Sequence, residues 1–166
     1  MNQSITNRSE RYSSPGPVPV TIVTGFLGSG KSTLLNQMLQ NKTGRKIGVI
    51  VHDFGSKNID QEMIKEVVGS VVTLDNGCIC CSLRTDLIGS VLGLATSDEK
   101  PDHIVIEASG VADPHMIAES FLGTEIWDKV VLDGVITVVD AEQVLDLDSE
   151  EMKLARSQAA CADIVL

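Results

Sequence analysis

The strongest chemical signal in the sequence is the segment 25–32, which reads GFLGSGKS and matches the phosphate-binding pattern G-x-x-x-x-G-K-[ST]. Its glycines let the backbone curl tightly enough for successive N–H groups to point at an anion. The lysine would place a positive charge on the β- and γ-phosphates, and the hydroxyl after it is the expected magnesium ligand, because Mg²⁺ prefers oxygen donors. The predicted nucleotide-binding residues of this segment are Gly25, Gly28, Ser29, Gly30, Lys31, Ser32 and Thr33.

A second signal is a cysteine cluster, Cys78, Cys80 and Cys81, which holds all but one of the chain's 4 cysteines. Thiolates are strong ligands for zinc and other borderline or soft metals, and a short loop can direct several sulfurs at one ion. Three sulfurs leave one ligand position open or supplied from elsewhere, which suits a site that must release its metal. Metal binding is the favoured interpretation, with redox chemistry or inert packing as alternatives. Cys161 lies in an alanine-rich stretch and is expected in the core.

Two carboxylates follow apolar segments that resemble buried strands. Glu107 ends the run 103–107 and is followed by Gly110, whose N–H could approach a γ-phosphate. In a phosphate-loop protein such an acid positions magnesium or the attacking water, so Glu107 is predicted to be functional. Asp53 follows the run 47–51 and is either a magnesium ligand acting through water or an ordinary loop carboxylate. Two histidines are expected at the surface without a role, namely His103 and His115.

The elements that must position these residues alternate along the chain. Strand patterns occur at 18–24, 46–51, 70–74, 103–107, 134–139 and 163–166, and helical patterns occur at 32–41, 59–68, 82–96, 114–121, from 141, and 150–162. This alternation predicts an α/β fold of the P-loop NTPase type, with a doubly wound, mostly parallel sheet flanked by helices. Loops at the carboxyl ends of such strands face the ligand. We expect a disordered tail over residues 1–17 and one nucleotide-binding domain over residues 18–166.

Composition narrows the class of protein. The 166 residues are 43% hydrophobic but only 3% aromatic, so the core of this domain must be aliphatic. Thirteen basic against 23 acidic residues give a net charge of −10, which argues against nucleic acid as a partner and suits a protein that handles cations. No apolar run reaches the ~20 residues that a membrane helix needs, and the N-terminus has no apolar signal core. We therefore expect a cytoplasmic protein with no membrane partner.

Four segments together resemble the signatures of the CobW-like family of P-loop GTPases, a group that includes cobalamin-synthesis proteins and zinc chaperones. They are GFLGSGKST at 25–33, NGCICC at 76–81, EASGVADP at 107–114 and LDGVITVVDA at 132–141. The resemblance covers roughly residues 18–166. It implies a metallochaperone that binds GTP or GDP with Mg²⁺, hydrolyses GTP and delivers zinc or cobalt to a client metalloprotein. In this interpretation Lys31, Asp53 and Glu107 are catalytic, Ser32 and Asp53 hold Mg²⁺, and the cysteine cluster holds the delivered metal.

The sequence departs from the family pattern in two places. Family members often read NEFGE where residues 52–56 read HDFGS. The second acid of that pattern is Ser56 here, so His52 and Asp53 would have to supply the metal-binding donor that the missing carboxylate provides. The family's guanine-reading N-K-x-D follows the strand that begins at Asp163, and this chain ends before it. We therefore expect a truncated member that lacks this motif and the C-terminal domain, and its preference between GTP and ATP stays open.

Two functions other than a GTP-dependent metallochaperone are also compatible with the sequence. One is a truncated metal- and nucleotide-binding module without productive GTPase activity, and the other is a P-loop ATPase whose cysteines form a reversible disulfide. A homodimer that depends on nucleotide or metal is a candidate partner. If the chain is a GTPase, we expect nucleotide state to change metal affinity, and we expect slow hydrolysis because no arginine finger is evident.

Overall fold

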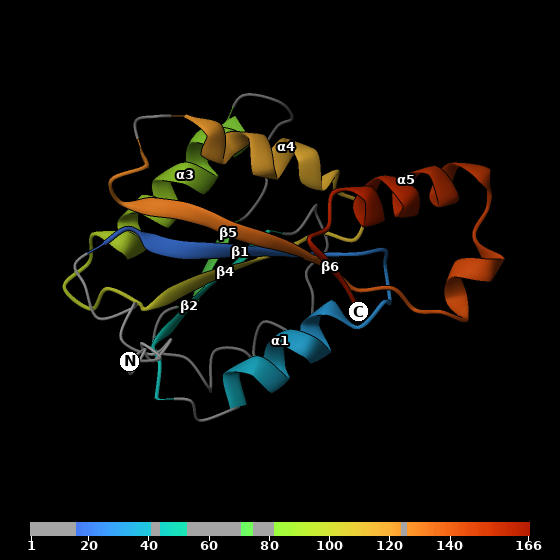
Figure 1. Cartoon of the computed structure of the whole chain (residues 1–166), viewed down its shortest axis with the longest axis horizontal. Coiled ribbons are helices and arrows are strands. Elements are labelled where there is room, and N and C mark those ends of the chain that lie inside the picture. Colours follow the sequence, from blue (N-terminus) through green and yellow to red (C-terminus); the bar gives the residue numbers. More distant parts are fainter. Residues whose placement is uncertain (1–15, 41–43, 53–70, 75–81, 124–125) are drawn as a thin grey trace, which may run out of the picture.

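Parallel strands form one sheet in the order β3-β2-β4-β1-β5-β6 (Figure 1). A computed structural model of the chain describes residues 16–40, 44–52, 71–74, 82–123 and 126–166. The strands of this part are β1 (Val18–Thr24), β2 (Ile47–His52), β3 (Val71–Leu74), β4 (His103–Ala108), β5 (Val130–Thr137) and β6 (Ile164–Val165). Each neighbouring pair runs parallel, which confirms the predicted α/β fold with helices flanking a parallel sheet.

Helices cover both faces of the sheet. They are α1 (Lys31–Gln40), α3 (Ser82–Ala95), α4 (Pro114–Glu119) and α5 (Ser149–Ala160), with short 3₁₀ helices η2 (Ser120–Leu122) and η4 (Gln143–Asp146). Helix α1 lies on one face, and α3, α4 and α5 lie on the other (Figure 1). None of the helices in the described ranges has the length and apolarity needed to cross a membrane.

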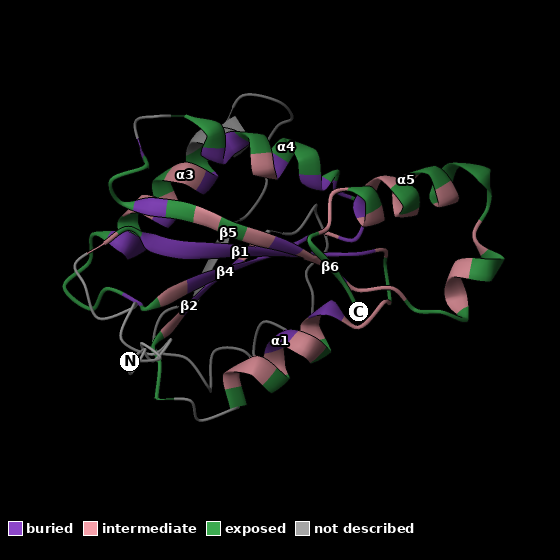
Figure 2. Ribbon diagram, in the orientation of Figure 1, coloured by how far each residue is buried: buried purple, intermediate pink, exposed green. Residues whose placement is uncertain are grey.

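The core divides between the two faces according to the alternation of side chains along each strand. On β4, Ile104 and Ile106 join the cluster under α3 and α4, whereas Val105 joins the cluster under α1. On β1, Ile22 and Val23 divide in the same way. Strand β1 is buried along its whole length because β4 and β5 flank it and helices cover it on both faces (Figure 2).

The C-terminal third differs in detail from the sequence-based prediction. Strand β5 begins at Val130 rather than at residue 134, and it ends at Thr137 rather than at residue 139. The segment expected to be a helix from residue 141 is instead the short η4, because one carboxylate oxygen of Asp140 accepts hydrogen bonds from the N–H groups of Glu142 and Gln143 and closes a tight turn. Helix α5 starts one residue earlier than predicted, at Ser149, where Asp148 forms a capping box with Glu151. The helix predicted over residues 59–68 lies outside the described residues.

Candidate nucleotide-binding site

The glycine-rich segment forms the turn that joins β1 to α1, as the motif requires. Its three glycines all have positive φ, 136° at Gly25, 75° at Gly28 and 97° at Gly30. Space as well as backbone angle excludes a side chain at Gly25, since a Cβ there would lie 2.1 Å from the carbonyl oxygen of Val138. The turn is therefore held tightly against the end of β5, and its backbone conformation depends on glycine.

Lys31 turns back over this segment. Its side chain is only 8% exposed, and its Nζ donates a hydrogen bond of 2.8 Å to the carbonyl oxygen of Phe26. The backbone N–H of Ser29 donates to the same oxygen at 3.3 Å. The ammonium group is thus placed at the turn where the sequence motif predicts bound phosphates.

Ser32 and Glu107 meet at the start of α1. Glu107 continues the alternation of β4 on the same face as Val105, so it lies on the side of the sheet that α1 covers. The Ser32 hydroxyl donates a hydrogen bond of 2.6 Å to Oε1 of Glu107, which is only 7% exposed. A hydroxyl and a carboxylate oxygen in contact beside a phosphate-binding turn form a hard-oxygen donor set of the kind that Mg²⁺ prefers, so these residues fit that ion.

The loop after β4, residues 109–112, lies directly against the glycine-rich turn. A Cβ at Gly110 would lie 2.7 Å from the backbone nitrogen of Leu27 and 2.9 Å from its Cα. Only glycine permits this approach without a shift of one backbone. The loop is also closed internally by a hydrogen bond of 2.9 Å from the Ala112 N–H to the Ser109 carbonyl oxygen.

The structure therefore brings Lys31, Ser32, Glu107 and Gly110 into one place, with Thr33 exposed beside them. It does not describe the other predicted site residues, because Asp53 and the cysteines Cys78, Cys80 and Cys81 lie outside the described ranges. Within those ranges, no group of three or more histidine, cysteine, aspartate or glutamate side chains could hold a metal ion. The predicted metal site thus remains a prediction.

One of the two histidines is less exposed than predicted. His103 is only partly exposed at the start of β4, where its Nε2 lies 2.8 Å from the Thr21 hydroxyl. Burial lowers the pKa of His103, a nearby Asp133 carboxylate opposes this effect, and Arg45 adds to it. Sequence patterning missed the burial because His103 precedes the apolar run and resembles a polar strand end. His115 is exposed, as predicted.

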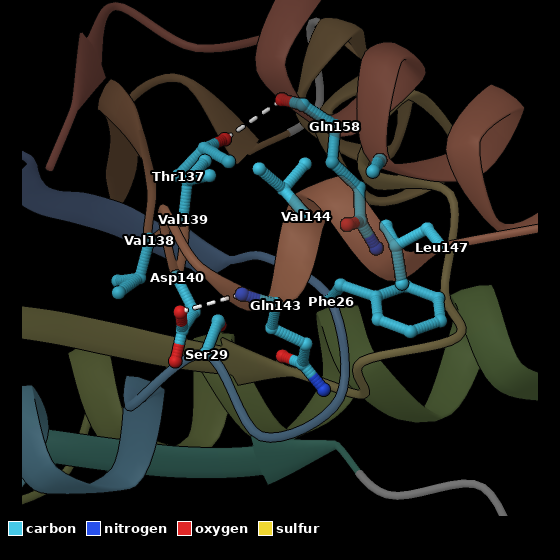
Figure 3. Close-up of a pocket in the computed structure, with 11 residues that line it drawn as sticks. Phe26, Ser29, Thr137, Val138, Val139, Asp140, Gln143, Val144, Leu147 and Gln158 are labelled. Atoms are coloured by element: carbon cyan, nitrogen blue, oxygen red, sulfur yellow. Dashed lines mark hydrogen bonds between the residues drawn. The ribbon is translucent and has the colours of Figure 1, made fainter.

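A buried glutamine was also missed. Gln158 of α5 has no exposed surface, and its amide Nε2 donates to the carbonyl oxygens of Gly110 and Ala112. It lines a small cavity of about 20 Å³, together with Phe26 and Ser29 of the glycine-rich turn (Figure 3). This volume suits about one water molecule, so the cavity is not the nucleotide pocket. Only a weak signal for this burial is present in the sequence: Gln158 is three positions from both Ala155 and Cys161, which are half-buried in the structure and so mark the inner side of the helix.

Comparison with known proteins identifies the family. The family model for the CobW/HypB/UreG nucleotide-binding domain matches residues 19–166. The chain belongs to this family. The resemblance inferred from the four sequence segments is thereby confirmed, and with it the P-loop NTPase fold.

Relatives of this CobW/HypB/UreG domain include zinc chaperones. The chain is 40% identical over 155 residues to the zinc chaperone YjiA of Escherichia coli, and the match covers 90% of this chain and 48% of the relative. It is 39% identical over 135 residues to the zinc chaperone CobW of a Sinorhizobium species, covering 78% of this chain and 38% of the relative. The chain thus spans half or less of the length of these curated relatives.

A solved structure gives the same assignment. The crystal structure of Zn(II)-bound YjiA GTPase from E. coli is similar to this chain with a TM-score of 0.64 and 29% sequence identity, covering 90% of this chain and 48% of the other. The similarity extends over most of the chain and supports its place in the CobW/HypB/UreG family.

Proposed function

We propose that the chain is the nucleotide-binding domain of a GTP-dependent metallochaperone, which binds and slowly hydrolyses GTP and delivers zinc or cobalt to a client metalloprotein. The observation that carries the nucleotide part is the hydrogen bond between Ser32 and Glu107, formed next to Lys31 at the glycine-rich turn. The metal part is supported by the cysteine cluster and by the similarity to zinc chaperones.

The described residues can divide the work of phosphate binding among them. The backbone of the turn from Gly25 to Gly30 would surround the phosphates, and the Lys31 ammonium would offset the charge on the β- and γ-phosphates. Ser32 and Glu107 would hold Mg²⁺, which supplies further charge neutralisation when bound, and Asp53 is the proposed third oxygen donor. Gly110 is placed beside the turn, where its N–H would report whether a γ-phosphate is present.

Hydrolysis would transfer the γ-phosphoryl group to water and release GDP and phosphate. In this proposal no arginine finger assists hydrolysis, so the intrinsic rate is expected to be low, on the order of 10⁻⁴ s⁻¹, as in GTPases that work without one. In this proposal Glu107 acts as a positioning group for magnesium, because its carboxylate is engaged by the Ser32 hydroxyl.

The cysteine cluster connects to the same edge of the sheet. Cys78, Cys80 and Cys81 come in sequence between Leu74, which ends β3, and Ser82, which begins α3. Since all strands are parallel, the carboxyl end of β3 is on the edge where β1 and β4 present the glycine-rich turn and Glu107. Nucleotide state could therefore change metal affinity, and any such coupling must be reciprocal.

Thiolate ligands suit a reducing compartment, so we propose the cytoplasm as the place of action.

Calorimetric titration of the chain with GTP, GDP and ATP, each with and without Mg²⁺, tests the nucleotide part. GTP should bind with an affinity that rises with Mg²⁺, and Lys31→Ala should abolish binding, whereas Gln37→Ala on the exposed side of α1 should not change it. Equal affinity for ATP and GTP would contradict the guanine preference, and no binding of either would contradict a nucleotide-dependent function.

Competition with a chromogenic chelator tests the metal part. Zn²⁺ and Co²⁺ should bind more tightly in the presence of a non-hydrolysable GTP analogue than with GDP, and replacement of Cys78, Cys80 and Cys81 by serine should remove that binding. Cys161→Ser is the matched control: it makes the same chemical change at a cysteine that packs against the core cluster, so metal binding should be unchanged. Equal affinities in the two nucleotide states would reject the coupling, and full binding by the triple variant would reject the site.

A further inference from the structure

Gln158 joins three parts of the molecule through one buried residue. Its amide Nε2 donates to the carbonyl oxygen of Gly110 at 3.0 Å and to that of Ala112 at 3.2 Å. Its own backbone carbonyl accepts a hydrogen bond of 2.7 Å from the hydroxyl of Thr137, at the end of β5 (Figure 3). The two carbonyl acceptors identify which end of the amide carries the nitrogen, because only the NH₂ group can donate to both. Residues 109–112 are therefore fastened to α5 and, through α5, to β5.

The same side chain lines the small cavity beside the glycine-rich turn. Oε1 of Gln158 accepts no hydrogen bond from the described residues, although Gln158 is fully buried. Gln158 shares the small cavity with Ser29, whose hydroxyl is also buried without a partner among these residues. Buried polar atoms are nearly always hydrogen-bonded, and the small cavity that both residues line has room for about one water molecule.

We infer that Gln158 is a positioning residue that holds residues 109–112 in the arrangement from which Gly110 distinguishes a nucleoside triphosphate from a diphosphate. This inference rests on the proposed nucleotide-binding function and adds to it the residue that controls the response to the γ-phosphate. Gly110 has no space for a side chain on the side of Leu27, so a shift of Gly110 in that direction would displace the glycine-rich turn. Fixing the Gly110 and Ala112 carbonyls fixes the two peptide planes that set where the loop lies.

Two substitutions of Gln158 separate a positioning role from a purely packing role, because they keep the side-chain volume and change only its hydrogen bonds. Methionine fills nearly the same volume as glutamine, so Gln158→Met would keep the core filled while leaving two buried carbonyl oxygens without their donor. Gln158→Glu keeps the shape but removes both N–H donors when the carboxyl group is ionised. Burial against two carbonyl oxygens should raise the pKa of that glutamate, and the protonated acid can donate one hydrogen bond again. A positioning role therefore predicts a defect in Gln158→Glu that acid partly reverses.

The experiment compares the full chain with Gln158→Met, Gln158→Glu and the matched control Gln40→Glu, which makes the same chemical change at an exposed position of α1. The measured quantity is the ratio of dissociation constants for GDP and a non-hydrolysable GTP analogue, with Mg²⁺, at pH 8 and pH 5.5. The wild type over the same pH range corrects for other groups, including Asp140 on the cavity wall. Thermal unfolding of each variant reports whether it is folded. In the unaltered protein, the side-chain NH₂ resonances of Gln158 provide a readout that needs no variant.

At pH 8 both Gln158 variants should lose about tenfold in this ratio, the effect of roughly one net hydrogen bond, while Gln40→Glu keeps it. Gln158→Glu should regain discrimination at pH 5.5 and Gln158→Met should not. The Gln158 NH₂ resonances should differ between the GDP and GTP-analogue complexes. The inference is overturned if the wild type discriminates between GDP and the GTP analogue and the folded Gln158 variants do so equally well. It is also overturned if the Gln158 resonances are the same in both complexes. In either case the proposed function stands. A wild-type protein that binds neither nucleotide would overturn the proposed function itself.

Discussion

The hydrogen bond between Ser32 and Glu107 links the first turn of α1 to the end of β4. Its length of 2.6 Å is that of a charge-assisted bond between a hydroxyl and a carboxylate. The two residues are 75 positions apart in the chain, so the pair depends on β1 and β4 being neighbours in the sheet. The same oxygen atoms are the proposed magnesium donors.

Ser32→Ala should therefore reduce, by at least about tenfold, the increase in nucleotide affinity that Mg²⁺ produces, because one oxygen donor to the ion is lost together with the hydrogen bond between Ser32 and Glu107. Titration of GTP with and without Mg²⁺ measures this effect, and Gln37→Ala is the control. An undiminished response to Mg²⁺ in Ser32→Ala would show that the ion is held elsewhere.

Cys161 should behave differently from the clustered cysteines. Burial raises the pKa of the Cys161 thiol, and the carboxylates of Asp113 and Asp163 raise it further. Because the thiolate is the reactive form, alkylation of Cys161 by iodoacetamide should be slow at pH 8 and should accelerate only at higher pH than for an ordinary thiol. Peptide mass spectrometry over a pH series measures this rate. Rapid labelling of Cys161 at pH 7 would contradict the assignment.

Residue identity alone did not reveal every important side chain. Lys31, Ser32 and Glu107 could be singled out because a spaced motif or a strand end marked them, and the structure places them together. Gln158 could not, because its importance comes from facing Gly110 across 48 positions of sequence. The partial burial of His103 was missed for a similar reason, since its contact with Thr21 depends on the pairing of β1 with β4.

At the scale of elements, the apolar runs predicted strands better than the polar stretches predicted turns. Strand β1 was predicted with its observed bounds, because a strand buried along all seven of its residues has a nearly continuous apolar sequence. Strand β5 was predicted to start too late, at Gly134, since the polar Asp133 resembles a break. In the structure Asp133 is exposed and Gly134 lies against the carboxylate of Asp163, so both positions are compatible with a strand.

Glycines within the helices and strands offer a test at this scale. A Cβ added at Gly89 of α3 would have no neighbour within 4 Å, so Gly89→Ala should raise the free energy of unfolding by about 0.5–1 kcal/mol through a less flexible unfolded chain. Gly48 of β2 is the contrasting position, because a Cβ there would lie 3.2 Å from the ring of Pro101 and 3.3 Å from Leu94. Gly48→Ala should therefore stabilise the chain less than Gly89→Ala does. Urea unfolding of both variants measures the difference, and equal effects of the two substitutions would contradict this account.

At the scale of the whole molecule, stability should depend on pH through His103. Burial lowers the pKa of this residue in the folded chain below its ordinary value of 6.5, so the unfolded chain binds the proton more readily. The stabilising contribution of neutral His103 is then fully present above pH 6.5 and is lost as the pH falls through 6.5 toward the folded value.

His103→Gln should flatten the decline in unfolding free energy over this acidic range, whereas His115→Gln at an exposed position should leave it unchanged. Denaturant unfolding at a series of pH values from 8 to 5 measures both profiles. A profile unaltered by His103→Gln would assign the acid sensitivity to other groups.

The position of Lys31 has a consequence for how tightly a nucleotide can be bound. A long cationic side chain free in solvent loses on the order of 2 kcal/mol of rotamer entropy when a ligand immobilises it. Here the fold has already immobilised it against the Phe26 carbonyl, so that loss belongs to folding rather than to association. The incoming phosphates meet a preorganised ammonium group, and affinity is gained without any new contact.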